Sequence, residues 1–335
     1  MEVMVEDFGV FLSKKSERVQ LKKDGKVFAE HALFNVDQIT IANRGISLSV
    51  DLIEDCMERG IQINFMSSSG KPYAKITSPS LNATVVTRRE QMMAYLDERA
   101  KQFACEIVAA KTKNQINLLK YFGKYRRNAA PELFEDIQAS IEKMEKIRSS
   151  IDKLPDLNID EIRGQLLSIE GRIGEAYWNS IGQIIPEELG FEGREHQNAK
   201  DPVNSAINYG YGILYSRVWG AIILAGLEPF AGFLHVDRPG KPSLVLDMVE
   251  EFRQPVVDRA IFGWLNKGGK ISLDDEGLTK DTRSEIAARV IERLDGVESY
   301  EGKKQKLRHI IQEQSRRLAT FLRGQRRYEA FVSAW

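Results

Sequence analysis

Residues 88–124 read RREQMMAYLDERAKQFACEIVAAKTKNQINLLKYFGK, and this stretch decides the fold. Its apolar residues recur every three or four positions, as they do on one face of an amphipathic helix. The stretch is therefore predicted to form one long helix or a closely joined pair. Seven further helices are expected after it, at 132–154, 158–182, 203–227, 243–254, 255–269, 280–296 and 303–332.

The residues before this stretch favour strands. Residues 10–33 read VFLSKKSERVQLKKDGKVFAEHAL, in which two short alternating apolar runs flank Asp24 and Gly25, a residue pair typical of a tight hairpin turn. Three similar runs lie at 36–43, 45–49 and 61–67. Between them, the segment 52–60 has helical spacing and ends at Gly60, a common residue at helix C-termini.

Strands followed by helices indicate an α+β fold, in which the two kinds of element are segregated along the chain. A chain of 335 residues suits two domains better than one. We therefore expect a small N-terminal β-rich domain over residues 1–80 and a larger all-α-helical domain over residues 81–335.

Composition argues against several protein classes. The 48 basic and 48 acidic residues cancel, so any contact with nucleic acid must be local. The longest apolar stretch, GAIILAGL, is far shorter than the ~20 residues of a membrane span, and the acidic N-terminus lacks the basic region of a signal peptide. Cys56 and Cys105 have no metal-like spacing and are expected as reduced thiols. The predicted location is the cytoplasm.

Glu170 lies in the segment QLLSIEGRIGEAYW, within a predicted helix. It follows Leu166 by four residues and precedes Ile173 by three, so its side chain shares their apolar face. A buried carboxylate costs several kcal/mol unless it is paired or bound to a metal. Two interpretations remain open: a metal or catalytic carboxylate, or a buried salt bridge with Arg163 or Arg172.

His235 lies in the segment EPFAGFLHVDRPGKPS, where Pro and Gly on both sides indicate an ordered loop between two helices. Histidine is a common metal ligand and general base, although a lone histidine is more often structural. The other three histidines have less organised surroundings. Among them, His196 lies in a polar loop and is at most a phosphate contact.

Asp247 and Glu250 share a face of the predicted helix 243–254, because they are three residues apart. Their like charges repel, unless a cation or Arg253 lies between them. The neighbouring Glu251 favours a solvated acidic face instead, whereas the apolar residues on both sides of Asp247 argue against it.

Two carboxylates and one imidazole, brought together, make a site for a hard divalent metal. Glu170, His235 and Glu250 are the residues proposed for it, with Asp247 as a supporting acid. No other chemistry competes, because the sequence has no G-x-G-x-x-G, P-loop, Cys-x-x-Cys, H-E-x-x-H or G-x-S-x-G motif. The sequence therefore favours a metal-dependent enzyme.

A basic stretch near the C-terminal end indicates a polyanionic partner. Residues 303–327 contain nine Lys and Arg residues and a single acid, Glu313, so their local charge is +8. A solvated helix face explains many charge runs, but an asymmetry of this size favours phosphate contacts. The segments 111–115 (KTKNQ) and 125–127 (YRR) add basic and amide donors on the long helix.

Three segments together resemble the CRISPR-associated protein one family: LLSIEGRIGEAYW, DPVNSAINYGYGILYSRVWGAIILAGLEPFAGFLH and PSLVLDMVEEFRQPVVDR. The strands VFLSKKSERVQL and ITIANRGISLS and the helical segment AKTKNQINLL extend the resemblance over essentially the whole chain. This family comprises the integrase and endonuclease that inserts new spacers into CRISPR arrays.

The resemblance implies an architecture and a site. Family members have an N-terminal β domain, a helical catalytic domain and a homodimeric state, and two dimers assemble around a dimer of the CRISPR-associated protein two. The positions of the family's metal ligands match Glu170, His235 and Glu250, and Asp247 matches a further acidic position. The family's metal is typically manganese or magnesium.

The resemblance also implies a reaction on double-stranded DNA. A free 3′-hydroxyl of a protospacer attacks a phosphodiester of the CRISPR repeat, and water in place of that hydroxyl gives hydrolysis. Candidate DNA contacts lie near the metal ligands at Arg238, Lys241, Arg253 and Arg259, on the helix 203–227 at Asn204, Tyr211 and Arg217, and in the basic stretch at Arg316, Arg317, Arg323, Arg326 and Arg327.

Two alternatives remain open at this stage. In the first, the protein is a DNA-binding scaffold of the spacer-acquisition complex without catalysis, and Glu170, His235 and Glu250 belong to a buried ion network. In the second, it is a metal-dependent phosphohydrolase that acts on small phosphate esters and has no use for the basic stretch.

Overall fold

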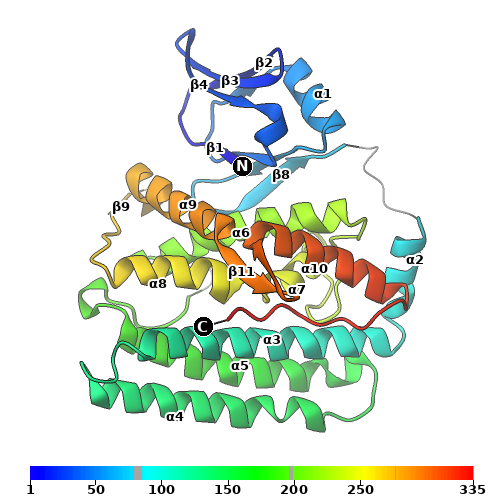
Figure 1. Ribbon diagram of the computed structural model, residues 1–335, viewed down its shortest axis with the longest axis vertical. Coiled ribbons are helices and arrows are strands. Elements are labelled where there is room, and N and C mark those ends of the chain that lie inside the picture. The colour runs from blue at the N-terminus through cyan, green and yellow to red at the C-terminus, as the bar shows by residue number, and fades with distance from the viewer. Residues whose placement is uncertain (79–84, 196–198, 276, 335) are drawn as a thin grey trace.

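The computed structural model describes residues 1–78, 85–195, 199–275 and 277–334 (Figure 1). Within these ranges, N-terminal strands precede a mostly helical region, as the sequence predicts. The expected domain boundary at residue 80 falls outside the described residues and stays a prediction, and His196 and Trp335 also lie outside them.

Two four-stranded sheets form the N-terminal part. In the first, the order is β1 (Glu2–Val5), β5 (Gln38–Ile41), β7 (Gln62–Met66) and β8 (Pro72–Ile76), and only β8 runs antiparallel to its neighbour. In the second, the order is β4 (Lys26–Ala32), β3 (Arg18–Lys23), β2 (Phe11–Lys15) and β6 (Ser47–Leu48). The helix α1 (Val50–Glu58) contacts β2 and β7, which belong to different sheets.

The predicted hairpin turn at Asp24 and Gly25 is confirmed. Both residues have positive φ angles, 51° and 73°, which is the conformation of the two central residues in a type I′ turn between β3 and β4. The N-terminal part has a hydrophobic core of its own, which consists mainly of buried aliphatic side chains such as those of Leu12, Ile39 and Ile63.

The helical region contains α2 (Val85–Ala94), α3 (Glu98–Gly123), α4 (Pro131–Arg148), α5 (Ile159–Ile184), α6 (Pro202–Leu224), α7 (Ser243–Val249), α8 (Arg259–Leu265), α9 (Lys280–Asp295) and α10 (Leu307–Leu322). A π-helical segment, Arg253–Asp258, leads into α8. Residues 88–124 thus form a closely joined pair, because Asp97 caps α3 by accepting a hydrogen bond from the N–H of Arg99.

The region is mostly rather than wholly helical. Two short antiparallel pairs, β9 (Leu273–Asp274) with β10 (Gly277–Leu278) and β11 (Val297–Tyr300) with β12 (Lys303–Lys306), were not predicted from the sequence. Residues 303–306, expected as the start of a helix, form a strand because Glu301 and Gly302 adopt the positive φ angles of a tight hairpin turn.

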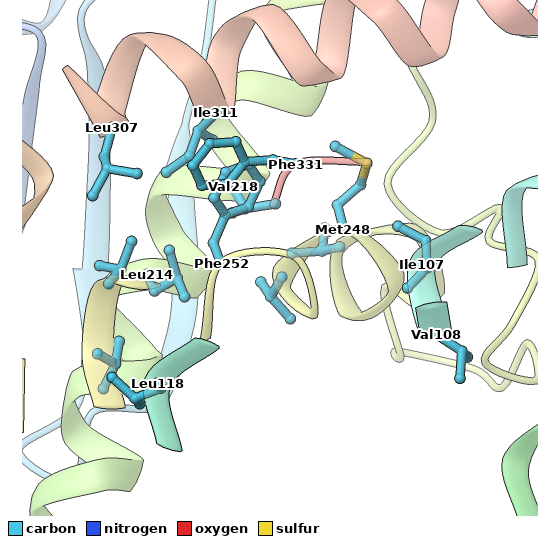
Figure 2. Packing of buried hydrophobic residues seen from close by; sticks show 14 of the residues in the cluster. Ile107, Val108, Leu118, Leu214, Val218, Met248, Phe252, Leu307, Ile311 and Phe331 are labelled. Carbon is cyan, nitrogen blue, oxygen red and sulfur yellow. The ribbon is translucent and has the colours of Figure 1, made fainter. Parts of the chain in front are cut away.

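Helix α6 runs through the middle of the helical region, with α7, α9 and α10 around it, while α3, α4 and α5 pack side by side (Figure 1). Figure 2 shows the packing where these layers meet: Leu214 and Val218 of α6 lie in the same core as Met248 and Phe252. The ring of Phe252 stacks on that of Phe331, with centroids 5.5 Å apart. Among the described residues, no helix has the length and apolarity needed to cross a membrane.

The N-terminal sheets are attached to the helices by specific contacts. The side-chain amide of Gln62 donates to the carbonyl of Gly220 (3.1 Å), and the hydroxyl of Tyr209 donates to Glu6 (2.8 Å). The loop at Gly70 approaches α6 so closely that a Cβ on Gly212 would lie 1.7 Å from the carbonyl oxygen of Gly70. The first sheet therefore holds a fixed position against α6, whose C-terminal end leads into the loop of His235.

Candidate metal centre

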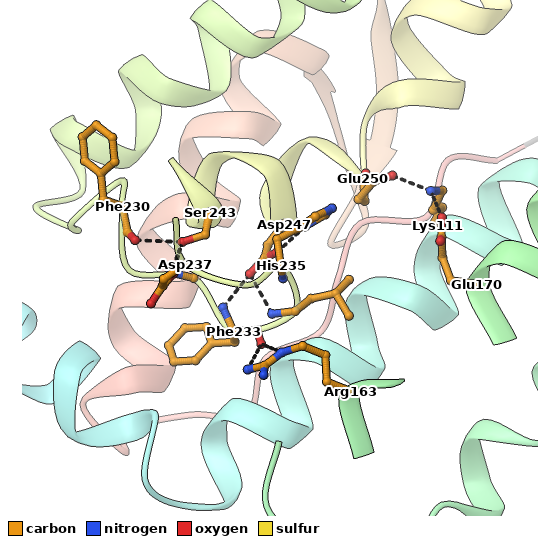
Figure 3. A network of polar contacts seen from close by, with 12 residues as sticks. Lys111, Arg163, Glu170, Phe230, Phe233, His235, Asp237, Ser243, Asp247 and Glu250 are labelled. Carbon is orange, nitrogen blue, oxygen red and sulfur yellow. Dashed lines mark hydrogen bonds and ion pairs between the residues drawn. The ribbon is translucent and has the colours of Figure 1, made fainter. Parts of the chain in front are cut away.

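The carboxylate of Glu170 extends from the middle of α5 toward α3 (Figure 3). Helix α5 begins with a capping box between Asn158 and Glu161, which satisfies N–H groups of its first turn. Leu166 and Ile173 are buried, as the apolar face predicts, whereas the side chain of Glu170 is 27% exposed. Arg163, one of its two suggested salt-bridge partners, pairs with Asp160 instead.

Asp247 organises the loop that carries His235. Its fully buried carboxylate accepts hydrogen bonds from the backbone N–H groups of Phe233 (2.7 Å), Leu234 (3.0 Å) and His235 (2.9 Å). The same carboxylate lies 2.7 Å from Nδ1 of His235 (Figure 3). A proton on Nδ1 then leaves the lone pair on Nε2, which is the form of imidazole that binds a metal.

The loop is held from two further sides. The hydroxyl of Ser243 accepts a hydrogen bond from the N–H of Gly232 (2.8 Å), and the guanidinium of Arg163 donates to the carbonyl of Phe233 (3.2 Å). A Cβ on Gly232 would lie 2.8 Å from a carboxylate oxygen of Asp247, so only glycine fits there. The position of His235 is therefore fixed by its surroundings.

Glu250 directly follows α7 and is buried, with 3% of the residue exposed. One carboxylate oxygen, Oε2, lies 2.7 Å from Nζ of Lys111, and the other lies 3.1 Å from the guanidinium of Arg253. The same ammonium of Lys111 donates a hydrogen bond to Glu170 (Figure 3). Lys111 therefore joins the two carboxylates that the sequence analysis assigned to one site.

The charges of this cluster stabilise one another. Burial by itself raises the pKa of Glu250, but Arg253, Lys111 and His235 more than offset that effect and lower it to about 2. Burial by itself lowers the pKa of Lys111. The two carboxylates of Glu250 and Glu170 raise it by more than burial lowers it, so the pKa of Lys111 lies above its usual value. Glu250 is thus an anion and Lys111 a cation near neutral pH.

The alternative of a solvated acidic face is wrong. Asp247 and Glu251 are fully buried, and Glu251 accepts hydrogen bonds from the hydroxyl of Tyr328 and from the N–H of Phe331. Burial raises the pKa of Glu251 to about 8. The acids of this segment therefore face the protein interior, and each meets different partners there.

The donor set fits a hard divalent ion in its chemistry. Glu250 and Glu170 supply carboxylate oxygens, and His235 supplies an imidazole nitrogen. Oxygen Oε2 of Glu250 is buried and faces the ammonium of Lys111, 2.7 Å away. In the described part of the chain, however, no three His, Cys, Asp or Glu side chains are arranged closely enough to hold an ion, since Lys111 lies between the two glutamates.

Sequence reasoning missed the role of Lys111, which was interpreted as a donor for a polyanion. The signal was present: Lys111 follows Ile107 by four residues and precedes Leu118 by seven, so it belongs to the apolar face of the helix. Asn114 and Gln115 share this burial, and Asn114 donates to the carbonyl of Glu251 (2.9 Å). These residues are buried partners rather than exposed donors.

Several candidate DNA contacts near the site are buried or paired. The guanidinium of Arg253 lies 4.8 Å from the ring centre of Tyr211 and pairs with Glu250. On α6, the guanidinium of Arg217 is shielded from water, and this burial lowers its pKa. Arg259 lies over the ring of Tyr121. Arg238 is exposed and Lys241 is partly exposed in the loop of His235, so these two remain the more accessible candidates.

The two other candidates on α6 also have partners inside the protein. The amide of Asn204, which is almost fully buried, donates to the carbonyl of Gly193 (2.7 Å). The hydroxyl of Tyr211 donates to Asp258 (2.6 Å). A role for them in DNA binding stays a prediction.

The basic stretch 303–327 is partly neutralised by acids elsewhere in the chain. Four of its nine basic residues pair with acids outside the stretch: Lys306 with Asp295, Arg308 with Asp37 and Asp295, and Arg317 and Arg326 with Glu301. Arg316 pairs with Glu313, which lies inside the stretch. Arg323 donates to the hydroxyl of Thr87 (2.9 Å), and Arg327 is exposed. The surface charge of this stretch is therefore smaller than +8.

A cavity of about 660 Å³ is lined in part by residues of the loop that carries His235. Its lining includes Tyr73 of β8, Tyr215 and Trp219 of α6, and Phe230 and Gly240 of the loop. None of the proposed metal ligands lines it. The cavity and the candidate metal centre are thus separate features that share one loop.

Comparison with known proteins gives consistent matches. A family model described as "CRISPR associated protein Cas1" matches residues 3–289. The chain is 34% identical to the CRISPR-associated endonuclease Cas1 1 of Archaeoglobus fulgidus, with 100% of both chains covered. It is 33% identical to the CRISPR-associated endonuclease Cas1 1 of Francisella tularensis subsp. novicida, with 99% of both covered.

Two solved structures share the fold. A Cas1 protein from Thermotoga maritima superimposes with a TM-score of 0.79 at 22% identity, covering 99% of this chain and 100% of that one. A casposase bound to its integration product superimposes with a TM-score of 0.80 at 23% identity, covering 97% of this chain and 91% of that one. At these identities, the likeness concerns the fold.

Proposed function

The chain belongs to the Cas1 family of CRISPR-associated proteins, and from this premise we propose that it is a metal-dependent DNA endonuclease and integrase that inserts new spacers into CRISPR arrays. Two relatives more than 30% identical over their full length are named endonucleases. The observation that carries the proposal is that Lys111 joins the carboxylates of Glu170 and Glu250, while the buried carboxylate of Asp247 orients the imidazole of His235.

Glu170, His235 and Glu250 are the proposed ligands of Mn²⁺ or Mg²⁺. Asp247 accepts a hydrogen bond from Nδ1–H of His235, which keeps the proton on Nδ1 and leaves Nε2 free for the ion. Arg253 balances the charge of Glu250. When bound, the ion supplies stabilisation of the charge that develops on the scissile phosphate.

The proposed reaction is a strand transfer. The oxygen of a DNA 3′-hydroxyl attacks the phosphorus of a repeat phosphodiester, a new P–O bond forms, and the P–O bond to the leaving 3′-oxygen breaks. The attacking hydroxyl loses its proton, and the leaving oxygen gains one. Water in place of the hydroxyl gives hydrolysis at the same residues, so nuclease activity follows from the same site.

The assembly is also proposed from the family. Residues 1–80 would form the dimerisation domain of a homodimer, residues 81–335 the helical catalytic domain, and a dimer of the CRISPR-associated protein two would be the partner. A solved structure with the same fold is described as a "Cas6-RT-Cas1--Cas2 complex" (TM-score 0.78, 19% identity), which supports this partner. A cytoplasmic location fits an enzyme that acts on cellular DNA arrays.

Replacing Glu170 tests the proposal. Glu170→Ala removes one oxygen ligand, so we expect Mn²⁺-dependent cleavage and integration of duplex DNA to fall about 100-fold or more. Because Glu170 is only half-buried, the fold should persist, which circular dichroism will show. Glu175→Ala, an exposed position on the same helix, is the matched control and should keep full activity.

The outcome also separates the alternatives. Full activity in folded Glu170→Ala protein would sink the proposed site. DNA binding without any cleavage in Mn²⁺ would favour the non-catalytic scaffold. Hydrolysis of small phosphate esters that does not change with salt would favour the phosphohydrolase, because only a DNA substrate gives a steep salt dependence.

A further inference from the structure

The ammonium of Lys111 lies where the two glutamates of the proposed metal site meet. It donates a hydrogen bond to Oε1 of Glu170 and lies 2.7 Å from Oε2 of Glu250 (Figure 3). The lysine side chain is 11% exposed, and that of Glu250 is 5% exposed. Two carboxylates this close repel each other unless a cation lies between them. Lys111 supplies that cation.

The contacts of the three side chains are unequal. Glu250 is held by Arg253 as well as by Lys111, so it keeps one cationic partner if the ammonium leaves. Oxygen Oε2 of Glu250 is buried and lies 2.7 Å from the ammonium of Lys111. Glu170 is half-buried and keeps access to solvent. A lysine ammonium is a point charge on a flexible stem, so it can withdraw without disturbing α3.

We propose that Lys111 is a positioning residue of the metal centre: its ammonium holds Glu170 and Glu250 together in the metal-free protein and is displaced when the divalent ion binds. This inference rests on the proposed function, since it assumes that the two glutamates are ligands. The site is then assembled before the ion arrives, and two carboxylates do not face each other without a cation at any stage.

Lys111→Met tests the displacement, because methionine has a similar length and no charge. Without the competing ammonium, Mn²⁺ no longer has to displace a cation, so its Kd measured by titration calorimetry should fall about tenfold. Without Mn²⁺, the variant should melt at a lower temperature than the wild type, since the glutamates lose their shared cation. The rise in Tm on adding Mn²⁺ should be larger than in the wild type.

The control is Lys113→Met, which removes an exposed lysine from the same helix. Its Kd for Mn²⁺ and its Tm should match those of the wild type. Equal or weaker Mn²⁺ binding by Lys111→Met would overturn the displacement, because Lys111 would then remain in place beside the ion. Absence of Mn²⁺ binding by the wild type would overturn the metal site itself, and the two failures are thereby distinguished.

A measurement on the wild type covers the case in which the variant does not fold. Lys111 should react slowly with an amine-acetylating reagent when its ammonium bridges the glutamates. Addition of Mn²⁺ should raise its labelling several-fold relative to Lys113, as followed by mass spectrometry of the digested protein. Labelling of Lys111 that stays constant or falls with Mn²⁺ would contradict displacement.

Discussion

At the scale of single residues, the carboxylate of Asp247 organises the loop that carries His235. It is fully buried, and it fixes three consecutive backbone N–H groups and the imidazole of His235. A buried carboxylate is stable only when such donors surround it. Asp247 therefore holds the imidazole of His235 in place, and its role as a supporting acid of a metal site stays a prediction.

Asp247→Asn should be costly although it is isosteric. The new amide group presents N–H toward backbone N–H donors, so we expect a loss of about 2–4 kcal/mol in the free energy of unfolding by urea. Affinity for Mn²⁺ should fall about 10–100-fold, because the imidazole of His235 loses its fixed orientation. Asp136→Asn, on an exposed position of α4, is the control and should change stability by less than about 0.5 kcal/mol. Unchanged Mn²⁺ affinity in Asp247→Asn would contradict the positioning role.

At this scale the sequence singled out four candidate residues, Glu170, His235, Asp247 and Glu250, because each interrupts an apolar pattern. It did not predict the partners. Lys111 and Glu250 are 139 positions apart, and no local pattern shows which cation a buried carboxylate will meet. The suggested partner Arg163 instead supports the loop through Phe233, a contact that depends on how α5 packs against that loop.

Among the elements, Asp258 joins the π-helical segment to two helices. Its carboxylate accepts hydrogen bonds from the hydroxyls of Tyr177 on α5 (2.7 Å) and Tyr211 on α6 (2.6 Å). Burial nevertheless raises its pKa to about 6, although the two tyrosines and the guanidinium groups of Arg194 and Arg253 act in the opposite direction. The protonation of this junction is therefore sensitive to mildly acidic pH.

The folded protein should lose stability through this group as the pH rises. Between pH 4 and 6 the folded state holds a proton on Asp258 that the unfolded state, with a pKa near 3.8, has released. The contribution of Asp258 to the free energy of unfolding therefore falls by up to about 3 kcal/mol between pH 4 and 6, and it stays low at higher pH. Urea unfolding at pH 4.5, 5.5 and 7 in chelator should show the wild type losing stability relative to Asp258→Asn. A pH-independent difference between the two would contradict the shifted pKa.

Elements whose signal is local were predicted well. The hairpin at Asp24 and Gly25 and the end of α1 at Gly60 depend on positive φ angles that these residues adopt readily. The pair β11 and β12 was missed because KKQK lacks the β-branched and aromatic residues of a strand. It forms a strand because the turn at Glu301 and Gly302 folds it back on β11.

At the scale of the whole molecule, the segregation of strands and helices followed from the change of hydrophobic period alone. The contacts between the two parts did not, because they join residues such as Arg308 and Asp37 that are far apart in sequence. The same long-range pairing altered the meaning of the basic stretch: its charge was read correctly from the sequence, but acids from other elements neutralise part of it.

The remaining exposed cations of this stretch are where DNA binding should depend on salt. They include Lys304 on β12 and Arg327 beyond α10, besides Lys303. If Lys304 and Arg327 both contact phosphates, replacing them by Gln should weaken DNA binding for all sequences and reduce the slope of log K against log salt by about 2. Fluorescence anisotropy with a labelled duplex between low and moderate salt measures that slope.

Replacing Lys23 and Lys26, two exposed cations of the N-terminal hairpin, by Gln makes the same charge change and should leave the slope as it is. Equal slopes for the two double variants would mean that DNA binds elsewhere, because a nonspecific charge effect lowers both alike and a phosphate contact lowers only one.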